Sequence, residues 1–173
     1  MNNFRNLVIQ ALVVILILSA FSIDGNAQDQ ELQGSKFGIS AALQTEQLDL
    51  LFPIWTSNSF VVVPSVSLAY ASDVATDIGF GMALRYNLLK GDAVPYLGGR
   101  AGMFILSPNV GNSINDYVFG PFVGGEYFID KHFSFSVEAQ LNITKSDKNS
   151  LRFGNPDGTN FNTATLAMAS FYF

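Results

Sequence analysis

The sequence predicts an all-β fold, an eight-stranded antiparallel up-and-down transmembrane β-barrel, and three observations lead to it. Charged residues make up only 13% of the 173 residues, about half the roughly 25% of ordinary soluble proteins. Several segments alternate residue by residue between large apolar and small or polar side chains, which is the period of a strand and not of a helix. The connections between these segments alternate between short and long.

Composition excludes several other classes of protein. The formal net charge is −5 and no cluster of Lys and Arg is present, so we expect no nucleic-acid partner. The absence of Cys excludes a disulfide scaffold, a thiolate metal site and a Cys nucleophile. We expect no metal and no cofactor.

A secretory leader precedes the strands. Arg5 is followed by the apolar stretch 7–23, and residues 25–27 end in the small side chains that a signal peptidase reads. We therefore expect residues 1–27 to be a cleaved signal peptide and residues 28–173 to be the mature domain, exported from the cytoplasm. A retained membrane helix is the alternative, because the apolar stretch reaches the lower limit of a span.

Eight segments are predicted strands. In chain order they are Lys36–Gln44, Leu50–Thr56, Phe60–Ala71, Ile78–Leu88, Val94–Leu106, Tyr117–Ile129, Phe133–Thr144 and Thr163–Phe173. The pattern is clearest in Ile78–Leu88, where all six even positions are large and apolar, and Phe133–Thr144 and Phe60–Ala71 repeat it. Pro64 and Pro121 each remove one ladder donor, so we expect a bulge or a gap in pairing there.

The connections favour a simple meander. The expected connections are 45–49, 57–59, 72–77, 90–93, 107–116, 130–131 and 145–162. No helical pattern, repeat or linker separates the strands, so successive strands should pair in antiparallel fashion. The first and last strands should pair as well, because an open sheet edge in hydrocarbon costs several kcal/mol for each unpaired backbone group.

The apolar face of the strands is expected to meet lipid. If it faced inward, as in a soluble lipocalin-like carrier, the water-facing surface would consist of Gly, Ala and Ser with very few charges. Soluble surfaces carry about 25–35% charged residues. Facing inward, the small residues leave room in the narrow bore for Arg85, Arg100, Glu126 and Glu138. We expect these four to form a polar network in the lumen and the barrel not to conduct appreciably; a proton or ion path is the alternative.

Three segments carry a resemblance to a known family. They are Pro95–Gly102, Gly120–Phe128 and the terminal Phe171–Phe173. The chain resembles the small bacterial outer-membrane β-barrel proteins, the OmpX/OmpA-type barrels of the outer membrane protein β-barrel domain family. This resemblance covers the whole mature chain and implies a location in the outer membrane of a Gram-negative-type bacterium, among lipids and lipopolysaccharide.

The family resemblance also implies a topology and an assembly signal. Both chain ends and the short connections would lie in the periplasm, and the connections 107–116 and 145–162 would face outward. Phe171 and Phe173 would form the signal that the barrel assembly machinery reads. The parity of the last strand leaves its lipid-facing side open, because Leu166, Met168 and Tyr172 alternate with these phenylalanines. Candidates for interfacial aromatic girdles are Trp55, Tyr86, Tyr117 and Tyr127.

The sequence favours a non-catalytic monomer, with a structural or surface-interaction role through its outer loops. An outer-membrane lipid-modifying enzyme, similar to a lipid A deacylase, is one alternative, because His132, Ser134 and Glu138 invite a hydrolase reading. The topology places His132 on the periplasmic side and the other two in the lumen, which argues against it. The loop 145–162 could contact lipopolysaccharide phosphates or Ca²⁺, or be a solvated loop with a Pro-Asp-Gly turn.

Overall fold

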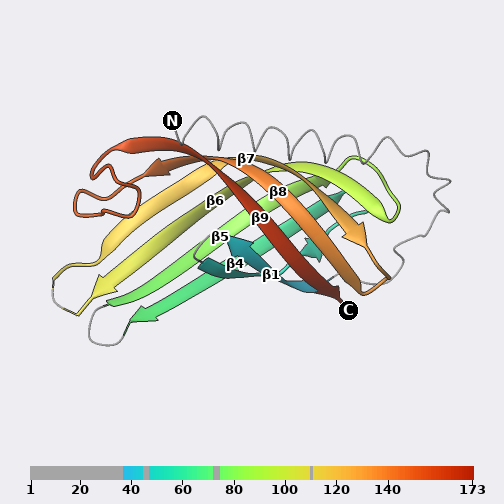
Figure 1. Ribbon diagram of the computed structural model, residues 1–173, viewed down its shortest axis with the longest axis horizontal. Coiled ribbons are helices and arrows are strands. Elements are labelled where there is room, and N and C mark those ends of the chain that lie inside the picture. Colours follow the sequence, from blue (N-terminus) through green and yellow to red (C-terminus); the bar gives the residue numbers. More distant parts are fainter. Residues whose placement is uncertain (1–36, 45–46, 72–74, 110) are drawn as a thin grey trace, which may run out of the picture.

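The computed structural model describes residues 37–44, 47–71, 75–109 and 111–173, so the expected signal peptide lies outside the described residues. In this part of the chain one antiparallel sheet closes on itself (Figure 1). Its strands are β1 (Gly38–Gln44), β2 (Gln47–Leu51), β3 (Ile54–Trp55), β4 (Phe60–Ala71), β5 (Ala75–Asn87), β6 (Ala93–Pro108), β7 (Ile114–Phe128), β8 (Phe133–Lys145) and β9 (Thr159–Tyr172). Among the described residues, no helix is long and apolar enough to cross a membrane.

The sheet closes through β1, which pairs with β2 on one side and with β9 on the other. Both β2 and β3 pair with β4 in one continuous register, so together they make one strand of an eight-stranded barrel. Neighbouring strands are consecutive in sequence and antiparallel throughout. The predicted eight-stranded antiparallel up-and-down barrel is confirmed.

Proline explains the break between β2 and β3. Pro53 lies in the break and faces Pro64 of β4, and neither residue has a backbone N–H to donate. The chain still stays in place, because the Phe52 N–H donates to the Pro64 carbonyl at 2.8 Å and the Gly38 N–H donates to the Pro53 carbonyl at 2.8 Å. The gap expected near Pro64 is therefore present on its β2–β3 side, without a shift of register.

Pro121 produces a similar gap between β7 and β8. The ladder runs from Tyr117 opposite Lys145 to Phe119 opposite Ile143, and resumes at Phe122 opposite Gln140. Two residues of each strand separate these pairs, so the register is unchanged and there is no bulge. The prediction of a gap at Pro121 is confirmed.

Several strands are longer than the apolar pattern predicted. β6 runs on to Pro108, β7 begins at Ile114 and β9 begins at Thr159, which shortens both long connections. β2 begins at Gln47, inside the connection expected at 45–49. Backbone hydrogen bonds do not require apolar side chains, so the ladder continues where the alternation that marks a strand in the sequence has ended.

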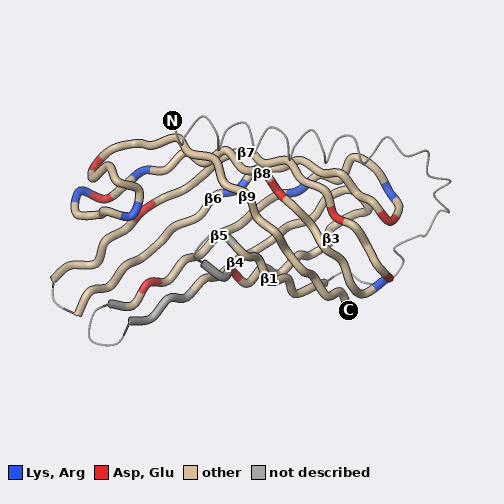
Figure 2. The backbone as a smooth tube through the Cα atoms, viewed as in Figure 1, with Lys and Arg blue, Asp and Glu red and all other residues tan. Residues whose placement is uncertain are grey.

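The two faces of the barrel carry opposite chemistry. On the outer face, Phe80, Met82 and Leu84 of β5 are 52%, 54% and 59% exposed. The inner face of β8 is buried and polar, and consists of Ser134, Ser136, Glu138, Gln140, Asn142 and Thr144. Figure 2 shows the charged residues gathered mainly in the loops and turns at the two ends, with long uncharged stretches of strand between them.

The last strand follows the same division. Leu166, Met168 and Tyr172 are buried inside the barrel, whereas Phe171 and Phe173 are 47% and 59% exposed outside it. The inner apolar residues have local partners. Leu166 and Met168 pack with Ala42 of β1, and Tyr172 packs with Val94 and Phe128. The open question about the parity of β9 is thus answered by packing across the bore.

Glycine makes space for large rings inside this narrow barrel. A Cβ atom added at Gly98 would lie 2.2 Å from the carbonyl oxygen of Leu84 and 2.3 Å from the Phe122 ring. The Leu84 carbonyl belongs to the neighbouring strand and cannot move without disturbing the ladder. Gly98 is therefore required by close approach of β5 and of a buried ring.

Replacement of Gly98 by Ala is predicted to lower the free energy of unfolding by about 1–3 kcal/mol, as overpacking does. The adjacent Gly99→Ala is a matched control, because the nearest atom to its added Cβ lies 4.0 Å away; its effect should stay within about 0.5 kcal/mol. Urea unfolding of the two variants in lipid vesicles, followed by the gel mobility of unheated samples, measures both. Equal stabilities would contradict the packing argument.

Candidate functional site

A buried ion pair lies in the bore near the end that holds the carboxy terminus. The Arg85 Nη2 atom on β5 lies 2.7 Å from the Glu126 Oε2 atom on β7, and both side chains are almost fully buried. The other oxygen of Glu126 accepts hydrogen bonds from the hydroxyls of Ser134 and Tyr172, each at 2.6 Å. Four strands, β5, β7, β8 and β9, are thereby joined through one carboxylate.

Aromatic rings enclose the same arginine. The Arg85 guanidinium lies 4.6 Å from the centroid of the Tyr96 ring and 5.7 Å from that of Trp55. Trp55 also packs edge-on against Tyr172, with centroids 6.4 Å apart. Trp55 lies inside the barrel and not in an outer girdle, which corrects the sequence prediction. Its strand position explains this, because Trp55 pairs with Val61, whose side chain faces inward and is 1% exposed.

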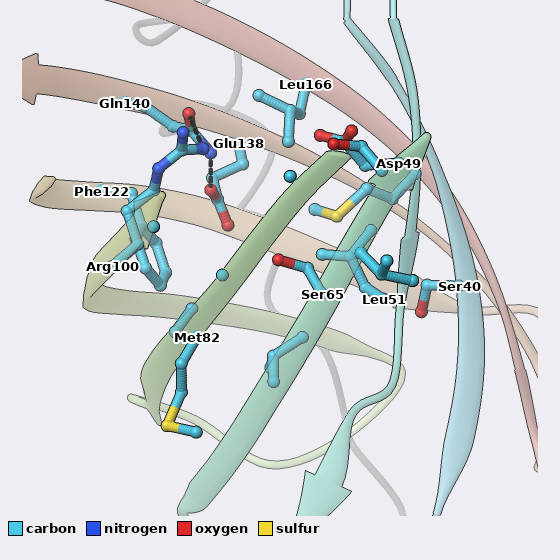
Figure 3. Close-up of a pocket in the computed structure, with 18 of the residues that line it drawn as sticks. Ser40, Asp49, Leu51, Ser65, Met82, Arg100, Phe122, Glu138, Gln140 and Leu166 are labelled. Carbon is cyan, nitrogen blue, oxygen red and sulfur yellow. Dashed lines mark hydrogen bonds between the residues drawn. The ribbon is translucent and has the colours of Figure 1, made fainter. Parts of the chain in front are cut away.

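A second polar group lies further along the bore. Gln140 donates to the Glu138 Oε1 atom at 2.5 Å and accepts a hydrogen bond from the Arg100 guanidinium. Figure 3 shows these three side chains turned toward one another across the bore, with Ser65 and Leu166 on other parts of the wall. Arg100 and Glu138 are therefore linked through an amide and not by a direct ion pair.

The four charged residues singled out in the sequence thus lie on the inner face in two groups. Sequence reasoning missed the partners that complete each group: Tyr96, Ser134, Tyr172, Trp55 and Gln140. Inward parity was visible for Ser134 and Gln140. For the three aromatic residues the sequence offered no signal, because large rings fit the outer face equally well.

Side chains fill most of the bore. The free space among these residues is a cavity of about 80 Å³, room for a few water molecules. Leu51, Val63, Phe122 and Leu166 line it beside Arg100 and Glu138. The arrangement can hold buried charge and ordered water. In the part of the chain that the structure describes, no group of three or more His, Asp and Glu side chains is arranged to hold a metal ion.

The connection from β8 to β9, residues 146–158 (the covering loop), folds back over the opposite end of the barrel. Arg152 of this loop pairs with Asp77 of β5 and, at 3.4 Å, with Asp116 of β7. Its guanidinium lies 4.5 Å from the centroid of the Phe104 ring. Ser150 donates to Asp116 at 2.6 Å, and the Asp147 N–H does so at 2.9 Å. The covering loop is thereby fastened to three strands.

The remaining aromatic candidates lie on the outer face. Tyr86, Tyr117 and Tyr127 are 41%, 49% and 58% exposed. Tyr117 lies toward the end with the covering loop, whereas Tyr86 and Tyr127 lie toward the end with the short turns. Their positions near strand ends suit interfacial girdles.

The turn 129–132 fastens the last strand. The Tyr172 N–H donates to the His132 carbonyl at 2.7 Å, and the His132 Nδ1 atom lies 2.8 Å from the Tyr172 carbonyl oxygen. The imidazole also stacks on Phe171, with centroids 5.8 Å apart. Ser134 and Glu138 contact Glu126 and Gln140. The three residues of the hydrolase reading therefore each have another partner.

Solved structures resemble this barrel. The amino-terminal β-barrel domain of Pseudomonas aeruginosa OprF superposes with a TM-score of 0.52 and 10% sequence identity, over 82% of this chain and all of that chain (100%). Neisserial surface protein A (NspA) gives a TM-score of 0.52 and 14% identity, over 79% of this chain and 93% of that chain. The chain has the fold of a small outer-membrane β-barrel. No protein-family model matches the sequence of this barrel, and a comparison with curated proteins gives no match.

Removal of the charge on Glu126 tests the ion pair of the barrel. Glu126→Gln leaves the Arg85 guanidinium buried without a counter-charge, and should lower the free energy of unfolding by about 3–5 kcal/mol. The double variant Arg85→Met/Glu126→Leu removes both charges and should recover most of that loss. Urea titrations in vesicles compare the three proteins. A double variant as unstable as Glu126→Gln would show that the pair itself supplies the stability.

The turn of the barrel at Asp130 provides a pH test. Backbone hydrogen bonds from His132 and Phe133 hold the pKa of the exposed Asp130 carboxyl below its ordinary value of 3.8. A lowered folded-state pKa gives stability that is present above the ordinary value and is lost as pH falls through the folded-state value. The stability difference between the wild type and Asp130→Asn should therefore be largest near neutral pH and vanish in stronger acid. Amide exchange of His132 and Phe133, followed by NMR, measures it; a difference independent of pH would contradict it.

Proposed function

We propose that residues 28–173 form a monomeric, non-catalytic barrel in the outer membrane of a Gram-negative-type bacterium. Its role in this proposal is structural, or is one of surface interaction through the loops at the end with the covering loop. The single observation that carries the proposal is the exposed apolar outer face. The argument below starts from that face.

Large apolar side chains from strands all around the barrel point outward and are between 38% and 65% exposed. We call this set the outer belt: Ile39, Leu43, Leu50, Ile54, Phe60, Phe80, Met82, Leu84, Leu97, Phe119, Val123, Phe135, Leu141 and Phe171. Monomers in water rarely expose contiguous apolar patches beyond a few hundred Å². A hydrocarbon environment removes this cost, and a closed ladder leaves no backbone edge unpaired in it. The outer belt therefore favours a membrane barrel over the soluble lipocalin-like carrier.

The strands are long enough for this environment. β5 has 13 residues, and a tilted strand of about 10 residues crosses an apolar layer of about 25 Å. We propose that the turns 56–59, 88–92 and 129–132 face the periplasm and that the covering loop faces outward. The contrast in length between the connections at the two ends supports this orientation, since barrels of this fold have short periplasmic turns and long outer loops.

Export and insertion follow from the two ends of the chain. We propose that the signal peptide 1–27 directs export, and that the barrel assembly machinery reads Phe171 and Phe173. The exposure of both phenylalanines on the outer face supports this role. Tyr172, between them, is anchored inside the bore by its hydrogen bond to Glu126. Recognition of the outer face would therefore leave the inner anchor undisturbed.

The lipid-modifying enzyme receives no support from the contacts of His132, Ser134 and Glu138, which have separate partners and lie in the bore or at the turn. Mass spectrometry of lipid A from cells with and without the protein tests this alternative. Loss of an acyl chain only in the presence of the protein would favour an enzyme. Unchanged lipid A is expected.

Location is tested by fractionation of cells and by gel mobility of heated and unheated outer-membrane samples. A closed barrel migrates differently before and after boiling, so a mobility shift in the outer-membrane fraction is expected. Recovery of monomeric protein from the aqueous fraction without detergent would overturn the proposal. Planar-bilayer recordings should show no porin-sized conductance steps, because side chains fill most of the bore.

Arginine substitutions on β5 test contact with lipid. Met82→Arg introduces a charge in the middle of the strand and should lower the free energy of folding into vesicles by about 2–4 kcal/mol. Leu88→Arg lies on the same face just beyond the strand end and should cost about 0–1 kcal/mol. Both native side chains are similarly exposed, at 54% and 51%. Equal effects in vesicles would show that the outer belt does not lie in hydrocarbon.

A further inference from the structure

A second cavity lies at the end of the barrel that the covering loop closes. It has a volume of about 400 Å³, and we call it the mouth cavity. Its lining includes Asp77, Leu106, Ile114, Asp116, Leu151 and Arg152. The walls come from strands β5, β6 and β7 and from the covering loop, so tertiary structure assembles the cavity from four separate parts of the chain. No residue of the polar groups in the bore takes part in it.

The charges around the mouth cavity are not balanced. Asp77 and Asp116 carry two negative charges and Arg152 carries one positive charge, which leaves one negative charge among the lining residues. Both oxygens of Asp116 accept hydrogen bonds, from the Asp147 N–H and from Ser150. Asp77 differs: its Oδ2 atom pairs with Arg152, whereas its Oδ1 atom is shielded from solvent and has no hydrogen-bond partner among the described residues. An anionic acceptor is thus available at the cavity wall.

The rest of the wall is aliphatic. Leu106 and Ile114 face each other across the β6–β7 ladder, and both line the cavity. Leu151 lines it from the covering loop and is 80% exposed, the largest exposure among the large hydrophobic residues described. A leucine so exposed beside an unpaired carboxylate oxygen presents two requirements at once. An apolar group would cover the leucine, and a cationic donor would satisfy the oxygen.

We propose that the mouth cavity binds small organic cations that carry a short aliphatic chain, such as alkylammonium ions. The ammonium group donates to Asp77 Oδ1, and the chain lies against Leu106, Ile114 and Leu151. Anions of the same shape are rejected, because two carboxylates face the cavity and its one guanidinium is already paired with both. The inference deepens the proposed surface-interaction role and rests on it, since it names the ligand class that the outer end recognises.

The test is a calorimetric titration of the mature protein in lipid nanodiscs with n-hexylamine, with empty nanodiscs as the blank. Saturable binding is expected for n-hexylamine, and none for hexanoate, which has the same chain and the opposite charge. Methylamine, which lacks the chain, should bind much more weakly. Equal binding of hexanoate, or no saturable binding of n-hexylamine, would overturn the proposal.

Variants locate the site. Asp77→Asn keeps the size and a hydrogen-bonding group toward Arg152 but removes the charge, and should weaken n-hexylamine binding about tenfold. Leu151→Asn touches neither ion pair and should weaken it as well, so a loss of binding cannot be attributed to a loosened covering loop alone. Asp157→Asn is the matched control, because Asp157 pairs with Lys145 elsewhere on the loop. Wild-type affinity in both Asp77→Asn and Leu151→Asn would contradict the assignment.

Failure of this inference can be separated from failure of the proposed function. Gel mobility of the unheated nanodisc sample reports insertion before any titration. The same titration in detergent micelles reports binding whether or not the protein enters lipid. Insertion without n-hexylamine binding would overturn the ligand site alone, whereas a protein that binds n-hexylamine but does not enter lipid would overturn the membrane proposal alone.

Discussion

Closure of the backbone ladder between β1 and β9 is the constraint on which the rest of the structure depends. Once the sheet is closed, alternate side chains are committed to the outside or to the bore, and a shift by one residue would exchange the two sets. The outer belt and the polar bore are two consequences of this single division. The prolines at positions 53, 64 and 121 interrupt hydrogen bonds but leave the register unchanged, so the division survives them.

The narrow bore then decides which inner side chains can coexist. Arg85 and Glu126 neutralise each other, and Tyr172 and Ser134 satisfy the second carboxylate oxygen. A buried pair of this kind is costly to break and contributes little as a whole, so its value lies in specifying which strands meet. Tyr172 joins the last strand to β7 inside the barrel, while His132 holds the backbone of the same residue at the turn. Closure and the ion pair therefore support each other.

Prediction from sequence succeeded where a local pattern is enough and failed where distant residues meet. The parity of Phe133–Thr144 placed each side chain on the correct face, because alternation is a property of any strand. Trp55 was assigned to the outside, since nothing in its short segment reveals that its neighbour Val61 faces the bore. The sequence also could not show that Arg100 reaches Glu138 only through Gln140, or that Arg152 returns to Asp77 across 75 residues of chain.

Residue order alone determined the strand count, the antiparallel order and the chemistry of the two faces, because these follow from period-two alternation and connection length. Only the folded barrel decided which polar groups pair, how β9 is oriented and where free space remains. Those outcomes depend on strand register around a closed ring and on how bulky rings share a bore of fixed width. The mouth cavity belongs to this second kind: its acidic and aliphatic walls lie far apart in the chain and meet only when the loop 146–158 folds over the end of the barrel.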